Sequence, residues 1–200
     1  MTATGPSSPP SADLLFVFAG ADERKRFAID AWRAGRAAVL VVSVARFEWR
    51  RVPLLGLPDD GGLLGLVEAT PPTERLFVLI VNGATVEARR VPKGRWGTWS
   101  EALAIAAFVR ERKAKSLLIC TSGYHLPRAL LAVRRALASG GGSGCTVAGI
   151  AAPETPGSPL ASPRSWRAPQ AWAALARERF KWLVYALGIP MAIESPPSTP

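Results

Sequence analysis

The residues best suited to chemistry lie in one stretch, Lys115 to Leu131, which reads KSLLICTSGYHLPRALL. His125 is the only histidine of the chain, and Arg128 follows it one helical turn later on the same face of a predicted helix. An arginine there can clamp a phosphate or carboxylate, and a histidine can bind that group or transfer a proton. The alternative is a histidine that caps a turn beside a surface arginine.

The small residues before this pair favour the same interpretation. Thr121, Ser122 and Gly123 follow an apolar run, 116–120, which is typical of a buried parallel strand. Where such a strand turns into a helix, free N–H groups and the positive end of the helix dipole form a natural anion site. Together with Tyr124, these residues would offer N–H groups and hydroxyls to the anion. A tight turn also needs small residues, and the two interpretations are compatible.

These side chains must be positioned by strands and helices, which the apolar periodicity predicts in alternation. Strands are expected at 13–19, 37–44, 75–81, 116–120 and 145–150, with an edge strand at 85–91. Helices are expected at 23–34, 98–113, from about 126 to 139, and at 170–187, whereas 45–52 reads as a short helix and 57–72 as mostly loop. A strand–helix–strand unit of this length implies a parallel sheet with right-handed crossovers.

The fold class predicted from this order is α/β. We expect a three-layer Rossmann-like sandwich with a mainly parallel sheet of about five strands and a closing C-terminal helix. Residues 13–188 form one domain, between Pro/Ser-rich tails at 1–12 and 189–200 that we expect to be disordered. The closing helix is basic and amphipathic, and packing against the sheet is favoured over binding to a membrane surface.

In such sheets ligands bind at the carboxyl ends of the strands. That rule places Gly20, Ser43 and the segment 121–128 along one edge. Thr98 and Glu101 match a Thr-x-x-Glu capping box at the start of a helix, which needs no further function. The alternative for Glu101 is a general base or a magnesium ligand.

Two further side-chain types near this edge have open roles. Trp96 and Trp99 flank Thr98, and packing against the helix end is favoured over stacking on a nucleotide base. Arg24 lies near the start of the first helix, where a place in the cleft and a solvated surface position are about equally expected. With one histidine and no Gly-x-Ser-x-Gly sequence, a Ser-His-Asp triad is not supported.

Composition limits the partners. Lys and Arg outnumber Asp and Glu by 25 to 15, a net charge of +10, which favours anionic partners, although solvated basic faces are an alternative. No dense basic tract or recognition motif supports a nucleic-acid binder. The two cysteines are expected to be buried hydrophobes without a zinc or disulfide framework. Without a secretory signal or an apolar run long enough to span a bilayer, we expect a cytoplasmic protein.

The run TSGYHLPRA, 121–129, resembles the Thr-Ser-x-Tyr/x-His-x-x-Arg-Ala signature of the YdcF-like family. This bacterial domain of unknown function also includes the SanA and ElyC envelope proteins. Gly20 with Arg24, Ala28 and Gly35 resembles the first strand–turn–helix of that family. Two further segments resemble its Thr-x-x-Glu-Asn/Ala motif and its last helix: 98–102, and the closing helix with Glu178, Lys181 and Tyr185.

The resemblance implies a Rossmann-like fold with a charged cleft that is suspected to be enzymatic. The catalytic candidates are His125 and Glu101. The candidates for substrate or anion binding are Gly20, Arg24, Ser43, Thr98, Thr121, Ser122, Gly123, Tyr124 and Arg128. The Ser-Gly-Gly of the family after its second strand is Ser43-Val44-Ala45 here, and Glu48 is the nearest match to its next acidic residue.

Members of the family have been tied to envelope or peptidoglycan metabolism and to nucleotide-type ligands. The expected ligand is therefore a phosphorylated or nucleotide-type small molecule. No residue pattern requires a metal, and Mg²⁺ or S-adenosyl-methionine is compatible with the predicted site. Two hypotheses follow: an enzyme acting on such a ligand, or a non-catalytic module that binds it.

Overall fold

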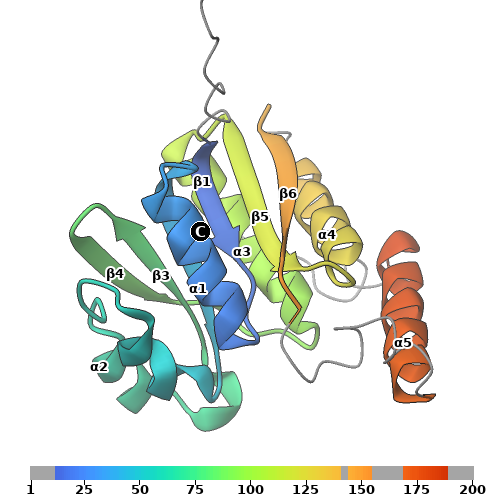
Figure 1. Cartoon of the computed structure of the whole chain (residues 1–200), viewed down its shortest axis with the longest axis horizontal. Helices are drawn as coiled ribbons and strands as arrows, with labels where there is room; N and C mark the ends of the chain where they lie inside the picture. The colour runs from blue at the N-terminus through green and yellow to red at the C-terminus, as the bar shows by residue number, and fades with distance from the viewer. Residues whose placement is uncertain (1–11, 141–143, 155–168, 189–200) are drawn as a thin grey trace, which may run out of the picture.

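The computed structural model describes residues 12–140, 144–154 and 169–188, and it has the predicted α/β architecture (Figure 1). The strands are β1 (Ala12–Val17), β2 (Ala37–Ala45), β3 (Leu76–Asn82), β4 (Thr85–Arg90), β5 (Ser116–Ser122) and β6 (Thr146–Ala152). The helices are α1 (Asp22–Arg33), α2 (Leu63–Glu68), α3 (Gly97–Arg112), α4 (Leu126–Ser139) and α5 (Pro169–Ala186), with 3-10 helices η1 (Glu48–Leu55) and η2 (Pro72–Glu74). The expected tails lie outside the described residues, except that Ala12 begins β1.

The six strands form one sheet in the order β4-β3-β2-β1-β5-β6. Strands β1, β2, β5 and β6 are parallel to their neighbours in this group, whereas β3 is antiparallel to both β2 and β4. The prediction of a mainly parallel sheet is confirmed. The expected edge strand is β4, which lies at one edge and brings the sheet to six strands.

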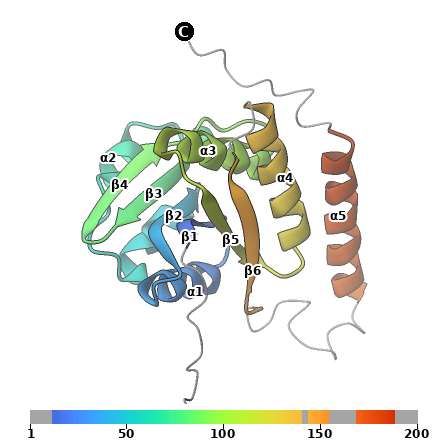
Figure 2. The ribbon, with the colours of Figure 1, turned by 90° about the horizontal axis from the view of Figure 1, so that it is seen from above.

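The sheet is buried on both faces, which gives three layers (Figures 1 and 2). In the central strand β1, Leu14 and Phe16 belong to the core under α3 and α4, and Leu15 and Val17 belong to the core under α1, η1 and α2. All four side chains are almost fully buried. This explains the continuous apolar run of this strand, since neither face can carry a polar residue without desolvating it.

Local details differ from the expectations at three places. The segment 57–72 is mostly loop, as expected, but it also contains the short helix α2, which buries Leu63 and Val67 against the core. Asp22 precedes the expected helix 23–34 and is of a type that often caps helices, but it is already helical, and Ala21 is the residue before α1. Thr98 does not cap α3, which follows Trp96 without a side-chain hydrogen bond.

The closing helix was expected to pack on the sheet, and this is also wrong. Helix α4 already covers β5 and β6 on that side, so α5 packs on α4 instead (Figure 2). Tyr185 is buried and its ring packs edge-on against Trp96 and Trp99, with centroids 6.4 and 6.5 Å away. The favoured expectation that these tryptophans pack at a helix end is confirmed. In the part of the chain that the structure describes, no helix has the length and apolar character needed to cross a membrane.

Candidate functional site

Helices α1, α3 and α4 all begin at the same edge of the sheet. Helix α1 follows β1 and α4 follows β5, so both start at the carboxyl ends of parallel strands. Helix α3 starts there too, because β4 has the same direction as β2. The structure thereby brings Gly20, Ser43, Thr121 and Glu101 to one edge, as the carboxyl-end rule predicts.

Arg24 joins the ends of two strands. Its Nη1 donates to the carbonyl of Ala19 at 2.7 Å, and its Nη2 donates to Ser122 Oγ at 2.8 Å. The side chain is buried. Of the two positions expected for Arg24, the cleft is therefore confirmed and the solvated surface is wrong. Its guanidinium lies against Gly20, where an added Cβ would come within 2.8 Å of Nη1.

Substituting Gly20 with alanine is expected to lower the free energy of unfolding by about 1–3 kcal/mol, because its φ of +136° is a region that only glycine adopts without strain. The added methyl also pushes against Arg24. Urea denaturation would measure the loss. The matched control is Gly35→Ala, where φ is +77° and no atom lies within 4 Å of the new methyl. An equal loss in both variants would contradict a role for the Arg24 contact.

Glu101 does not form the predicted capping box. Its Oε1 accepts a hydrogen bond from the backbone N–H of Ala19 at 2.7 Å, so it anchors the end of β1 to α3. Burial raises the pKa of Glu101, while the nearby Ser43 hydroxyl and the Ala19 N–H lower it. The Ser43 hydroxyl makes no hydrogen bond of ordinary geometry, although its side chain is fully buried.

His125 is the residue immediately before α4, and its backbone N–H donates to the carbonyl of Ser122 at 3.0 Å. Its ring packs edge-on against Phe18, with centroids 5.7 Å apart, and its Nδ1 lies 3.8 Å from Glu178 Oε2. Burial, and then the charge of Arg128, hold the pKa of His125 well below its usual range. The imidazole is therefore neutral at pH 7 and is a weak proton acceptor.

Arg128 is engaged by other side chains of the protein. Its Nε and Nη2 donate to the two carboxylate oxygens of Glu178 at 2.8 and 3.2 Å, and its Nη1 donates to Thr98 Oγ1 at 2.6 Å. The guanidinium also lies 5.7 Å from the ring centroid of Tyr185. The arginine that was expected to clamp an anion is thus already paired with a carboxylate. Thr98, which was expected to bind the ligand, accepts a hydrogen bond from Arg128 instead.

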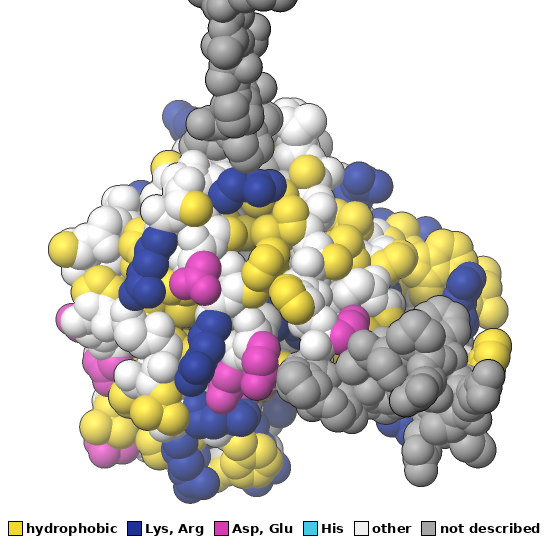
Figure 3. Space-filling model, viewed as in Figure 1, with side chains coloured by type: hydrophobic (Ala, Val, Ile, Leu, Met, Phe, Trp, Pro, Cys, Tyr) yellow, Lys and Arg dark blue, Asp and Glu magenta, His cyan; other side chains and the backbone are white. Residues whose placement is uncertain are grey.

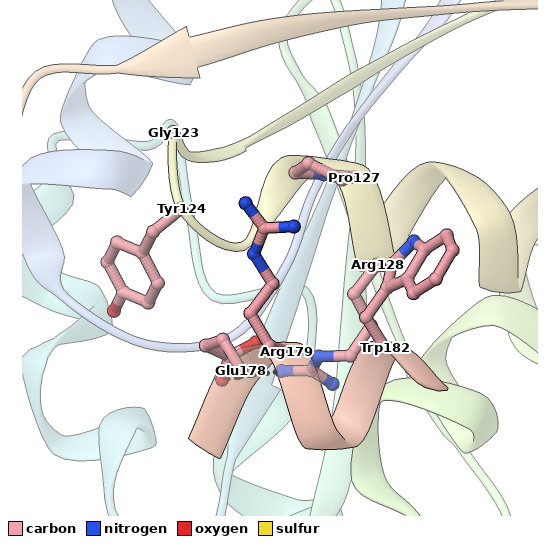
Figure 4. Close-up of a pocket in the computed structure, with 7 residues that line it drawn as sticks. All are labelled: Gly123, Tyr124, Pro127, Arg128, Glu178, Arg179 and Trp182. Atoms are coloured by element: carbon pink, nitrogen blue, oxygen red, sulfur yellow. Dashed lines mark hydrogen bonds and ion pairs between the residues drawn. The ribbon is translucent and has the colours of Figure 1, made fainter. Parts of the chain in front are cut away.

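A pocket of about 380 Å³ opens between the β5–α4 turn and α5 (Figure 4). Its lining residues are Gly123, Tyr124, Pro127, Arg128, Glu178, Arg179 and Trp182. Arg179 extends from α5 toward the turn, with Tyr124 and Trp182 on opposite sides of it (Figure 4). Three of the predicted site residues, Gly123, Tyr124 and Arg128, line the pocket. The other candidates do not: Gly20, Arg24, Ser43, Thr98, Glu101, Thr121, Ser122 and His125.

Sequence reasoning missed the α5 wall of this pocket. Glu178 entered only through the resemblance of the last helix, and Arg179 and Trp182 were not singled out. A signal was present, since 178 and 182 are one helical turn apart and lie on one side of α5. Nothing in the sequence indicates that this side faces α4.

Buried polar atoms at this edge that have no hydrogen-bond partner within the described chain include Arg24 Nε, Ser43 Oγ, Thr121 Oγ1 and His125 Nδ1. Buried polar groups in folded proteins are nearly always hydrogen-bonded, so these atoms mark the edge as an unusual part of the core. None of the four residues lines the pocket. Among residues 12–140, 144–154 and 169–188, no three side chains of His, Cys, Asp or Glu gather as metal ligands do.

Comparisons of the chain with protein-family models, with curated proteins and with solved structures find no match. The site must therefore be interpreted from its own chemistry.

Proposed function

We propose that this protein binds a phosphorylated, nucleotide-type small molecule in the pocket beside the start of α4. One observation carries the proposal: Arg179, which forms no ion pair within the described residues, lies between two half-exposed aromatic side chains at a helix N-terminus. Cationic and aromatic groups that converge in this way suit a ligand with a phosphate and a ring.

The phosphate would lie against Arg179 and the first turn of α4. That turn contains no acidic residue and no side-chain cap, so the positive end of the helix dipole favours an anion there. Because Pro127 has no N–H and the N–H of Ala129 donates to the carbonyl of His125, the backbone donors left in this turn are those of Leu126 and Arg128. The base would stack on Trp182 or Tyr124, which are 41% and 38% exposed. The pocket volume of about 380 Å³ is within the range of small-molecule sites.

Binding without catalysis is the function that this geometry favours. Glu101 does not line the pocket and its carboxyl is bonded to Ala19, while the depressed pKa of His125 makes it a weak base. An enzyme is the second candidate, and the observation in its favour is the unpartnered Nδ1 of His125, 3.8 Å from Glu178 Oε2.

Membership of the YdcF-like family, a cytoplasmic location and a link to envelope metabolism belong to the same proposal. The family and the envelope link rest on the resemblance carried by the TSGYHLPRA run, whereas the location is a separate expectation from the sequence. A nucleic-acid binder is disfavoured, since the sequence has no dense basic tract and no recognition motif. On the face shown in Figure 3, Lys and Arg side chains lie among apolar and acidic ones.

Thermal-shift and calorimetric titration with ADP, UDP, S-adenosyl-methionine and inorganic phosphate tests the proposal. We expect at least one nucleotide-type ligand to stabilise the protein, and Arg179→Gln to weaken its binding by about tenfold or more. The matched control is Arg177→Gln, on the same helix but outside the pocket lining. Equal affinity in the two variants, or no stabilisation by any of the ligands, would refute the site. Turnover of the ligand that is lost in His125→Gln would favour the enzyme.

A further inference from the structure

Helix α5 has an apolar stripe that faces away from the rest of the protein. Its members recur with helical spacing, Trp172, Ala176, Phe180, Leu183 and Leu187. The four large side chains are 49–68% exposed. Such a contiguous exposed apolar face is unusual for a protein surface that binds nothing.

The position of α5 leaves this stripe accessible. The helix lies at the outer margin of the molecule, with α4 on one side and no other described element on the opposite side (Figure 2). The side that faces α4 is the one with Glu178 and the buried Val184 and Tyr185. The apolar content of α5 therefore exceeds what its packing on α4 needs.

The charge around the stripe is of one sign. Helical spacing places Arg177 and Arg179 on either side of it, and both are exposed. The only acidic residue of α5 is Glu178, which is bonded to Arg128 on α4. An apolar stripe with tryptophan and phenylalanine, between arginines, is the pattern of a helix that lies in the interface of a bilayer.

We propose that the α5 stripe docks the protein on an anionic membrane surface, with Phe180 and Leu183 at the centre of the contact. In this position α5 lies parallel to the surface, the apolar side chains enter the acyl boundary, and Arg177 binds lipid phosphate, while Arg179 extends into the pocket and adds positive charge near the surface. A second copy of this chain is a poorer partner, because pairing two stripes brings arginines of both copies together without an acidic residue on the exposed faces.

Cosedimentation of the full chain with phosphatidylcholine vesicles, with and without phosphatidylglycerol, tests this docking. We expect binding to the anionic vesicles only, a decrease with added salt, and a loss of about tenfold or more in the Phe180→Glu/Leu183→Glu variant. Neither residue lines the pocket at the start of α4. The matched control is Phe47→Glu/Leu54→Glu, two apolar residues of similar exposure, 63% and 66%, near η1.

Three results would overturn the proposal. One is the absence of binding to the anionic vesicles, with both variants and the parent chain folded by circular dichroism. Another is an equal loss of binding in the two double variants, which would assign the contact elsewhere. The third is a dimer, seen by light scattering without vesicles, that is lost in the Phe180→Glu/Leu183→Glu variant. This result would show that the stripe binds a second copy of the chain.

Discussion

Replacing Glu48 with alanine is expected to cost about 3–5 kcal/mol of unfolding free energy, the largest effect of any single surface-facing substitution proposed for this protein. Glu48 Oε2 lies 2.5 Å from Lys25 Nζ, and the lysine is only 1% exposed. The same oxygen accepts the N–H of Ala45 at 3.2 Å. Without Glu48, the ammonium of Lys25 is left in the core between α1 and η1 with no opposite charge.

Urea denaturation at neutral pH measures this loss. The control is Glu74→Ala, which breaks an ion pair with Arg90 whose partners are both about half exposed and which should therefore change stability little. Lys25→Met combined with Glu48→Gln should recover much of the loss, because no buried charge is then left unpaired. If Glu48→Ala were as mild as Glu74→Ala, the Lys25 ammonium would have to reach solvent in the folded protein.

Arg128→Ala is expected to lower stability by about 3 kcal/mol and to release α5 from α4. The substitution leaves Glu178, with a side chain only 14% exposed, without its two-pronged partner, and it removes the hydrogen bond to Thr98. Arg128→Lys should not rescue the protein, because one ammonium cannot satisfy both carboxylate oxygens and the Thr98 hydroxyl in the same geometry. Urea denaturation and limited trypsin digestion of α5 measure the two effects.

An arginine on the same helix gives the matched control for this experiment. Arg134 is exposed and donates only to the carbonyl of Val147 at 3.2 Å, so Arg134→Ala should leave α5 protected from trypsin. If Arg128→Lys were as stable and as protease-resistant as the parent chain, the paired geometry with Glu178 would not be what holds α5.

The strands and long helices could be predicted because the spacing of apolar residues along the sequence follows which of their faces are buried. The run 37–44 is apolar except for Ser43 since β2 is covered on both faces, and the alternation in 85–91 reflects an edge strand with one face exposed. The direction of β3 could not be predicted, because an apolar run is compatible with either orientation. The glycines in and before helix α2 are typical of a loop, so the sequence did not predict this helix. Its contact with the core stabilises it.

The edge of the sheet where the candidate residues meet was predictable, but their hydrogen-bond partners were not. The topology of the strands fixes where Gly20, Ser43 and Thr121 meet, so the carboxyl-end rule located them, although none of the three lines the pocket. The partners of Glu101 and Arg128 are Ala19 and Glu178, which are 82 and 50 residues away in the chain. Local motifs favour nearby partners, which is why Glu101 was assigned to a capping box with Thr98.

Two arginines of α4 set the register of α5. Arg128 binds Glu178, and Arg135, two helical turns further along, donates to the backbone carbonyls of Tyr185 and Ala186. Because the spacing of the attachment points matches on both helices, a slide of one turn or a rotation of α5 would break both at once. The position of α5 on α4 therefore sets both the wall of the pocket and the direction in which the apolar stripe points. A ligand that moves α5 in the pocket must also change the orientation of the stripe.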